Sequence, residues 1–288
     1  MRTGIVVLPQ GRWSEDAQRW RRAEEYGFDH AWTYDHLAWR SLADEPWFGT
    51  VPVLTAAACV TSRIRLGTWV ASPNYRHPVP FAKDLMTLDD ISGGRFVLGV
   101  GAGGTGFDAT VLGDDVLPPR RRVDRLAEFV ELLDLLLTRP RTTWAGEFYE
   151  AVDARMVPGC VQQPRLPFVV AANGPRGLRV AAGFGQGWAT TGPSEDRDGW
   201  WGGVAALVGR LDDELAAAGR APADLDRYLS LDSGGYALAS AGAFEDAVGR
   251  AAELGFTDVV THWPRAEGVY AGSEAVLEEV ASRLPAST

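Results

Sequence analysis

An aspartate and a histidine stand side by side at the end of a short apolar segment, HAWTYDH at residues 30–36. Residues 30–34 are rich in aromatic and β-branched side chains, which predicts a strand ending just before Asp35 and His36. An imidazole titrates near neutral pH and can move a proton at a reacting centre, and the adjacent carboxylate can orient a ring. Position alone leaves two interpretations open: a functional pair, or a helix-capping aspartate beside a surface histidine.

Small residues follow two further expected strands. Residues 64–70 form a β-rich apolar run that stops at ASPN (71–74), and residues 95–100 form a second run that leads into GAGGTG (101–106). A helical pattern at 78–91 joins them, so we expect a βαβ unit with small residues where a parallel sheet places its ligands. The glycines formally match G-x-G-x-x-G, but residues 107–119 predict a loop instead of the helix that a dinucleotide site needs.

The sequence NGPRG at 173–177 joins another expected strand to its helix. Backbone N–H groups at a helix N-terminus form an anion site, and Arg176 can add a charge-assisted bond. The same residues are also compatible with a simple turn that has proline at the first helical position.

The remaining histidines lack metal-ligand spacing, so we expect no metal. His30 and His77 are interpreted as structural, whereas His262 at the end of the last expected strand is a candidate pocket residue. Tryptophans close to strand ends could line a pocket for a planar ligand. They are Trp32, Trp39, Trp47, Trp69, Trp188 and Trp263.

Strand-like and helix-like patterns alternate along the whole chain, which predicts a single (β/α)8 TIM barrel spanning residues 1–288, with loop insertions after strand four and before strand five. The second insertion, 141–167, is expected to hold a small hairpin. The expected strands are 4–8, 30–34, 64–70, 95–100, 168–172, 188–191, 228–238 (interrupted at 233–235) and 258–262. The expected helices begin with one capped by Ser14 and continue at 50–61, 78–91, 122–138, 176–184, 200–218, 243–254 and 273–284.

Composition and charge argue against a nucleic-acid-binding protein and against a membrane protein. The net charge is −10 and no basic stripe is visible, which argues against nucleic-acid binding. No apolar run approaches the roughly 20 residues of a membrane span, and the first residues lack a signal-peptide core, so we expect a cytoplasmic protein without membrane contact. Cys59 is expected to be a buried small hydrophobe, and Cys160 lies in a loop rich in proline and glycine.

Together these segments resemble the luciferase-like monooxygenase superfamily, and more closely its branch that depends on the deazaflavin coenzyme F420. The resemblance spans nearly the whole chain. It depends on GFD (27–29) with AWTYDH (31–36), LGTWV (66–70) with RHP (76–78), GGRFVLGVG (93–101), GEFY (146–149), QP (163–164) with Pro167, and AANGP (171–175).

The resemblance implies a barrel whose mouth receives a flavin-like ring. A non-prolyl cis peptide is expected between Trp69 and Val70, Asp35 and Ser72 match ring contacts, and His36 matches a catalytic histidine. Segment 174–177 matches the phosphate loop, and with Gly101 and Gly103 from the strand-four glycines it completes the expected cofactor site. The cofactor-binding residues are then Asp35, Trp69, Val70, Ser72, Gly101, Gly103, Asn173, Gly174, Pro175, Arg176 and Gly177.

The expected activity is hydride transfer between F420 and a small organic substrate, most simply the reduction of a C=C or C=N bond, in a homodimer. Gly104 stands where the sugar-phosphate dehydrogenases of this branch have a glutamate, which argues against that specific reaction. The alternatives are an FMN-dependent monooxygenase with the same pocket and a flavin-binding protein without turnover.

Overall fold

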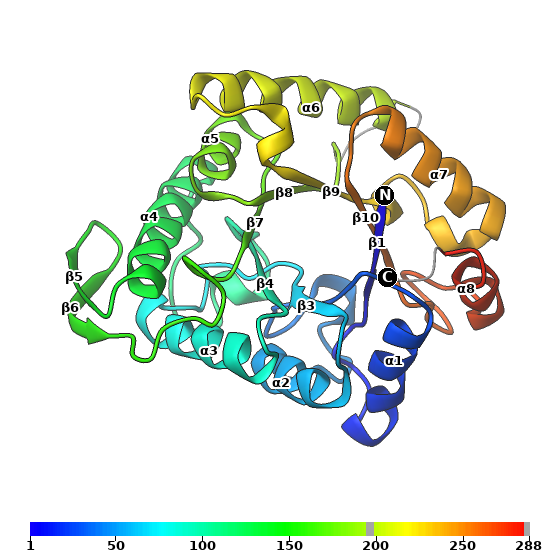
Figure 1. The fold of residues 1–288 in the computed structure, drawn as a ribbon, viewed down its shortest axis with the longest axis horizontal. Coiled ribbons are helices and arrows are strands. Elements are labelled where there is room, and N and C mark those ends of the chain that lie inside the picture. The colour runs from blue at the N-terminus through cyan, green and yellow to red at the C-terminus, as the bar shows by residue number, and fades with distance from the viewer. Residues whose placement is uncertain (194–198, 285–288) are drawn as a thin grey trace.

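A computed structural model describes residues 1–193 and 199–284. Its strands close into a parallel barrel in the order β1-β10-β9-β8-β7-β4-β3-β2, and the helices form a ring outside it (Figure 1). This is the (β/α)8 barrel that the alternating pattern predicted. The barrel strands are β1 (Arg2–Val6), β2 (His30–Thr33), β3 (Arg65–Thr68), β4 (Phe96–Gly101), β7 (Phe168–Ala171), β8 (Gly187–Thr190), β9 (Asp226–Ser230) and β10 (Asp258–His262). The helices are α1 (Trp13–Glu25), α2 (Thr50–Val60), α3 (Pro78–Ile91), α4 (Pro119–Thr138), α5 (Pro175–Phe184), α6 (Trp200–Ala217), α7 (Ala241–Glu253) and α8 (Glu274–Ala281).

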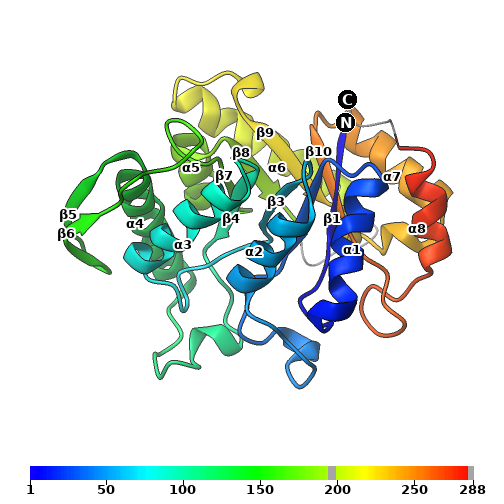
Figure 2. The ribbon, with the colours of Figure 1, turned by 60° about the horizontal axis from the view of Figure 1, so that its bottom comes forward.

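Both expected insertions are present. The loop after β4 contains a short 3-10 helix, η2 (Phe107–Ala109), and the segment before β7 contains the antiparallel hairpin β5 (Arg141–Ala145) and β6 (Glu150–Arg155). The hairpin lies beside α4, outside the barrel (Figure 2). The loops after β2 and β4 project from the end of the barrel opposite the chain's N-terminus (Figure 2). We call this end, formed by the carboxyl ends of the strands, the mouth.

Helical spacing of apolar residues in the sequence correctly predicted the buried face of α4. Its leucine, phenylalanine and valine side chains pack against the outside of the barrel, where a wide apolar stripe is needed. The buried positions are Leu126, Phe129, Val130, Leu132, Leu133, Leu136 and Leu137. A second apolar cluster fills the barrel interior and includes Val6, Trp32, Trp69, Val97, Val169, Tyr228 and Val260.

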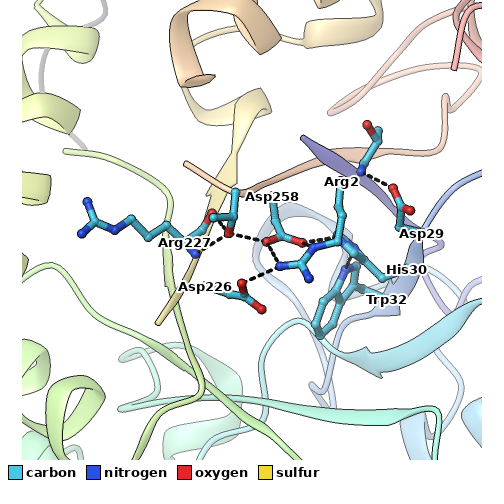
Figure 3. A network of polar contacts seen from close by, with 9 residues as sticks. Arg2, Asp29, His30, Trp32, Asp226, Arg227 and Asp258 are labelled. Atoms are coloured by element: carbon cyan, nitrogen blue, oxygen red, sulfur yellow. Dashed lines mark hydrogen bonds and ion pairs between the residues drawn. The ribbon is translucent and has the colours of Figure 1, made fainter. Parts of the chain in front are cut away.

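A polar network closes the barrel at the end opposite the mouth (Figure 3). Asp258 of β10 accepts hydrogen bonds from Arg2 Nε at 2.8 Å and from His30 Nε2 at 3.0 Å, and Arg2 also pairs with Asp226 at 2.7 Å. Trp32 Nε1 donates to His30 Nδ1 at 2.6 Å, which fixes the histidine tautomer. His30 is therefore a buried structural residue, as its sequence position indicated.

Glu24, near the end of α1, ties this helix to the segment entering β3. Its carboxylate accepts backbone N–H bonds from Ser62 at 2.9 Å, Arg63 at 2.6 Å and Ile64 at 2.9 Å. Partial burial would raise the pKa of Glu24, but these hydrogen bonds outweigh it and lower the pKa to about 2.

Several strand and helix boundaries are shifted from those expected; β1, for example, is Arg2–Val6 and not 4–8, and α4 begins at Pro119 and not at 122. Three further details of the sequence interpretation were wrong. Helix α1 begins at Trp13 without a side-chain cap, so Ser14 does not cap it; Asp16 instead accepts from the Gly11 N–H at 3.1 Å. Strand β9 ends at Ser230, and the chain continues in short 3-10 turns because the Asp232 carboxylate bonds to neighbouring backbone. Cys59 is exposed because α2 turns its alanine and leucine face, not this side chain, toward the core.

Candidate active site

The end of β3 forms the floor of the mouth. The peptide bond between Trp69 and Val70 is cis, as the resemblance implied. The Trp69 ring packs on Trp32 inside the barrel, with ring centroids 5.1 Å apart. Trp188, by contrast, stacks on Phe256 on the outer side of the barrel, so it does not line the mouth. The tryptophans near strand ends are thus divided between the mouth and the outer core.

The glycines of β4 and its loop make room for neighbouring protein atoms. A Cβ on Gly99 would lie 2.0 Å from the Thr68 carbonyl oxygen, and one on Gly101 would lie 3.0 Å from Val70. Gly103 has a left-handed φ of 75°, and its Cβ would lie 2.7 Å from the Asn74 side chain. Close packing against the end of β3 therefore requires these glycines, whatever ligand the mouth takes.

Asp35 is fully buried at the end of β2 and forms a two-point ion pair with Arg76. The distances are 2.6 Å from Arg76 Nη2 and 3.1 Å from Arg76 Nε. Burial alone would lower the pKa of Arg76, but bonding and charge attraction to Asp35 raise it, so the guanidinium stays charged. Both carboxylate oxygens of Asp35 are engaged by Arg76, so this ion pair joins the loops after β2 and β3.

His36 pairs with Asp108, a residue that sequence reasoning did not single out. His36 Nδ1 lies 2.5 Å from Asp108 Oδ2, and the other oxygen accepts the Leu37 N–H at 2.8 Å. Asp108 is 5% exposed, whereas the His36 side chain is 24% exposed. The imidazole is therefore bonded to a buried carboxylate while part of the ring stays accessible. No sequence signal distinguished Asp108 from Asp114 and Asp115 in the same loop, because contact between the loops after β2 and β4 depends on barrel closure.

A second polar chain lies on another side of the mouth. His262 Nδ1 is 2.6 Å from Asp232 Oδ2, and its Nε2 is 2.8 Å from the hydroxyl of Tyr34. The Tyr34 hydroxyl in turn lies 2.9 Å from that of Tyr270. The interpretation of His262 as a pocket residue placed it correctly near the mouth, but its tyrosine and aspartate partners were not identified from sequence. His77, expected to be structural, caps α3 by accepting the Val79 N–H at 3.2 Å.

The segment 173–177 joins β7 to the N-terminus of α5, as expected. Arg176 Nη2 pairs with Asp124 of α4 at 2.7 Å. The Asn173 side chain bonds to Thr190 at 2.6 Å and to the Gly192 carbonyl at 2.9 Å, which ties the ends of β7 and β8 together. A Cβ on Gly174 would meet open space, whereas one on Gly177 would lie 2.9 Å from Ala172, so only Gly177 is required by packing.

Several buried polar atoms around the mouth have no partner within the part of the chain that the structure describes. They are Ser72 Oγ, Arg122 Nε, Arg125 Nε and Arg176 Nη1. Buried polar groups are normally hydrogen-bonded, so leftover donors at one end of the barrel fit a polar, anionic ligand. Their other contacts hold them in place: Arg122 Nη1 bonds to the Gly103 carbonyl at 2.8 Å and Arg125 Nη2 bonds to Asn74 at 2.5 Å. Ser72 and Arg176 were predicted, whereas the two α4 arginines were not.

A polar cleft with a volume of about 510 Å³ opens next to this site, between the loops after β1 and β10. Glu45, Arg265 and Trp263 are among its lining residues, and Arg265 pairs with Glu45 at 2.6 Å. Neither His36 nor Ser72 lines it. Because its walls carry paired charges and no unpartnered buried atom, we do not assign the cofactor to this cleft.

A family model described as luciferase-like monooxygenase matches residues 1–233. The chain belongs to the luciferase-like monooxygenase family. An uncharacterised protein of Mycobacterium tuberculosis is 32% identical over 99% of each chain. An F420-dependent glucose-6-phosphate dehydrogenase of Nakamurella multipartita is 34% identical over 73% of this chain, which spans 60% of that relative's length. Coenzyme F420-dependent tetrahydromethanopterin reductase from Methanopyrus kandleri shares the fold, with a TM-score of 0.77 at 20% identity and 98% coverage of both chains.

In this luciferase-like barrel, the residues expected from sequence converge on one end: Asp35 and His36 after β2, Ser72 after β3, the glycines of β4 and the N-terminus of α5. Within the described residues, no cluster of His, Cys, Asp and Glu side chains has the geometry of a metal site. The helices of the described part are also too short or too polar to cross a membrane.

Proposed function

We propose that this protein is an F420-dependent oxidoreductase that transfers a hydride to or from a small organic substrate, with reduction of a C=C or C=N bond as the expected reaction. The observation that supports it best is the convergence on one mouth of an anchored histidine and four buried polar atoms that have no partner in the described part of the chain. The similarity to family members named as F420-dependent enzymes supports the choice of cofactor.

The residues present fit a deazaflavin. Trp69, Val70 and Ser72 would lie against its ring, and the chain segment 173–177 would bind its phosphate with Arg176. Arg122 and Arg125 would add positive charge along the anionic tail, because each holds a buried nitrogen that has no hydrogen-bond partner among residues 1–193 and 199–284. When bound, the deazaflavin supplies or accepts the hydride, and the protein positions and shields the reacting atoms.

His36 is the proposed proton donor or acceptor. Both oxygens of Asp108 accept hydrogen bonds, so the carboxylate holds a hydrogen on His36 Nδ1 and leaves Nε2 for the reacting centre. The partly exposed face of the imidazole gives Nε2 access to the mouth. Asp108 acts through His36 and is a positioning residue.

We do not propose a sugar-phosphate substrate. Gly104 is exposed on the loop after β4, where the resemblance places a glutamate in sugar-phosphate dehydrogenases. The absence of this glutamate from the loop after β4 agrees with a substrate that has no phosphate group.

Titration of the purified protein with F420 and, separately, FMN tests the proposal, since the two chromophores differ in absorption and fluorescence. We expect saturable F420 binding and a substrate-dependent change in its redox state that His36→Asn abolishes. Binding of FMN alone would favour a monooxygenase. F420 binding with no turnover in any reduction assay would favour a non-catalytic flavin-binding protein.

A further inference from the structure

The hydrogen-bonded chain Asp232–His262–Tyr34–Tyr270 is built from segments far apart in sequence. Asp232 follows β9, His262 ends β10, Tyr34 follows β2, and Tyr270 lies in the loop after β10. Each consecutive pair is within hydrogen-bonding distance, at 2.6, 2.8 and 2.9 Å. The His36–Asp108 pair does not belong to this chain, although the Tyr34 and His36 rings meet edge to face with centroids 5.8 Å apart.

The donors and acceptors of this chain have a defined order. Asp232 also accepts the backbone N–H of Ala237 at 2.8 Å and of His262 at 2.8 Å, so it is surrounded by donors and acts as a carboxylate. With neutral His262, Nδ1–H then donates to Asp232, and Nε2 accepts the Tyr34 hydroxyl hydrogen. The Tyr34 oxygen accepts from Tyr270, and the Tyr270 oxygen can accept a proton from outside. Uptake of that proton passes one proton through Tyr34 to His262 Nε2, which reverses the order of the chain and leaves His262 as an imidazolium, the state from which Tyr270 can donate.

Only one end of this chain reaches the surface. The side chains of Asp232 and His262 are each 1% exposed, and Tyr34 is 6% exposed, whereas Tyr270 is half-buried. Burial raises the pKa of both tyrosines, so they remain phenols that can pass a proton along. Tyr270 is therefore the least buried member of the chain, and we take it as the group through which a proton enters or leaves.

The position of Tyr270 is held by packing. Its ring stacks on the His262 ring with centroids 3.6 Å apart and an interplanar angle of 6°, and it also faces Trp39 at 6.5 Å. Its backbone φ of 62° is left-handed, which is unfavourable for a bulky side chain and persists only where the surroundings enforce it. Such strain in a loop beside the mouth is typical of a residue placed for function.

We propose that Tyr270 is a second acid–base group of the site, and that it exchanges a proton with the heteroatom of the substrate. The inference rests on the proposed function, because the hydride comes from reduced F420. In reduction, the hydride adds to the carbon of a polar double bond, and the Tyr270 O–H bond breaks as its proton passes to the imine nitrogen of a C=N bond or to the enolate oxygen that forms from a conjugated C=C bond. Tyr34 then reprotonates Tyr270, and the His262 imidazolium reprotonates Tyr34.

After the product leaves, a proton from solvent enters at Tyr270 and passes through Tyr34 to His262. The buried histidine therefore stores one proton per turnover. Oxidation of the product runs the same steps backwards. The substrate class is therefore a molecule with a polar double bond. His36 remains on the side of the mouth next to Asp35, where the resemblance places the cofactor ring.

The test compares Tyr270→Phe with Tyr236→Phe. Tyr236 lies beside Tyr270, with ring centroids 6.2 Å apart, but its hydroxyl donates to the His262 backbone oxygen at 3.0 Å and does not join the chain. Reduced F420 is used with 2-cyclohexenone and with 1-pyrroline as probes. We expect Tyr270→Phe to lower kcat about 100-fold or more, with an altered pH profile and unchanged F420 binding, and Tyr236→Phe to behave as wild type.

A second readout needs no cofactor. In the cofactor-free protein, ¹⁵N NMR of the His262 imidazole should give a titration midpoint that Tyr270→Phe and Tyr34→Phe shift and that Tyr236→Phe leaves unchanged. Equal behaviour of the Tyr270 and Tyr236 variants in both assays would overturn the relay while leaving the proposed function intact. Reduction of neither probe by a protein that binds F420 would overturn the substrate class. Failure to bind F420 would overturn the proposed function itself.

Discussion

Replacing Asp108 with asparagine tests how His36 is positioned. The Asp108 carboxylate accepts two hydrogen bonds, from His36 Nδ1 and from the Leu37 N–H, in a position where it is 5% exposed. An asparagine has one acceptor oxygen, so one of the two donors loses its partner and faces an NH₂ group. Leaving a buried donor unsatisfied costs about 1–3 kcal/mol, which corresponds to a factor of about 5 to 150.

We therefore expect Asp108→Asn to lower the free energy of unfolding by about 1–3 kcal/mol in urea titrations followed by tryptophan fluorescence. The kcat of F420-linked turnover should fall by about 10- to 100-fold because the imidazole is no longer held in one orientation. Asp114→Asn, at an exposed position of the same loop, is the matched control. If the two variants have the same stability and kcat, the contact with Asp108 does not position His36 and the reasoning is refuted.

Three further outcomes are expected. Glu24→Gln should lower the free energy of unfolding by about 1–2 kcal/mol near pH 7, a figure already reduced for solvent screening. Because the pKa of Glu24 in the folded state is lowered to about 2, the difference from wild type in urea unfolding should persist above pH ~4.5 and shrink as the pH falls toward 2. Gly99→Ala, whose Cβ would lie 2.0 Å from a β3 carbonyl oxygen, should lower the free energy of unfolding by about 1–3 kcal/mol. Gly183→Ala, in open space on α5, should leave it unchanged or raise it. Equal stabilities of the two variants would contradict the packing argument. Arg176→Gln should weaken F420 binding about fivefold in fluorescence titrations and reduce its salt dependence, while Arg179→Gln, exposed on the same helix, should not.

The sequence by itself determined the fold and the end of the barrel that bears the site. Alternating strand and helix patterns predicted the closed barrel, and the apolar spacing in α4 identified its buried face. The motif around His36 and the glycines after β4 lie at strand ends, and in a parallel barrel all such ends meet at one mouth. Local patterns are sufficient here because strand and helix periodicity are properties of short segments.

Tertiary structure decided which side chains meet. Asp108 reaches His36 across 72 positions of sequence, and His262 reaches Tyr34 across 228, because barrel closure brings distant loops together. No spacing rule relates such residues, since their separation depends on the lengths of the intervening helices and loops. Barrel closure also packs the β4 glycines against the end of β3. From the sequence pattern alone, these glycines were interpreted only as making room for a ligand.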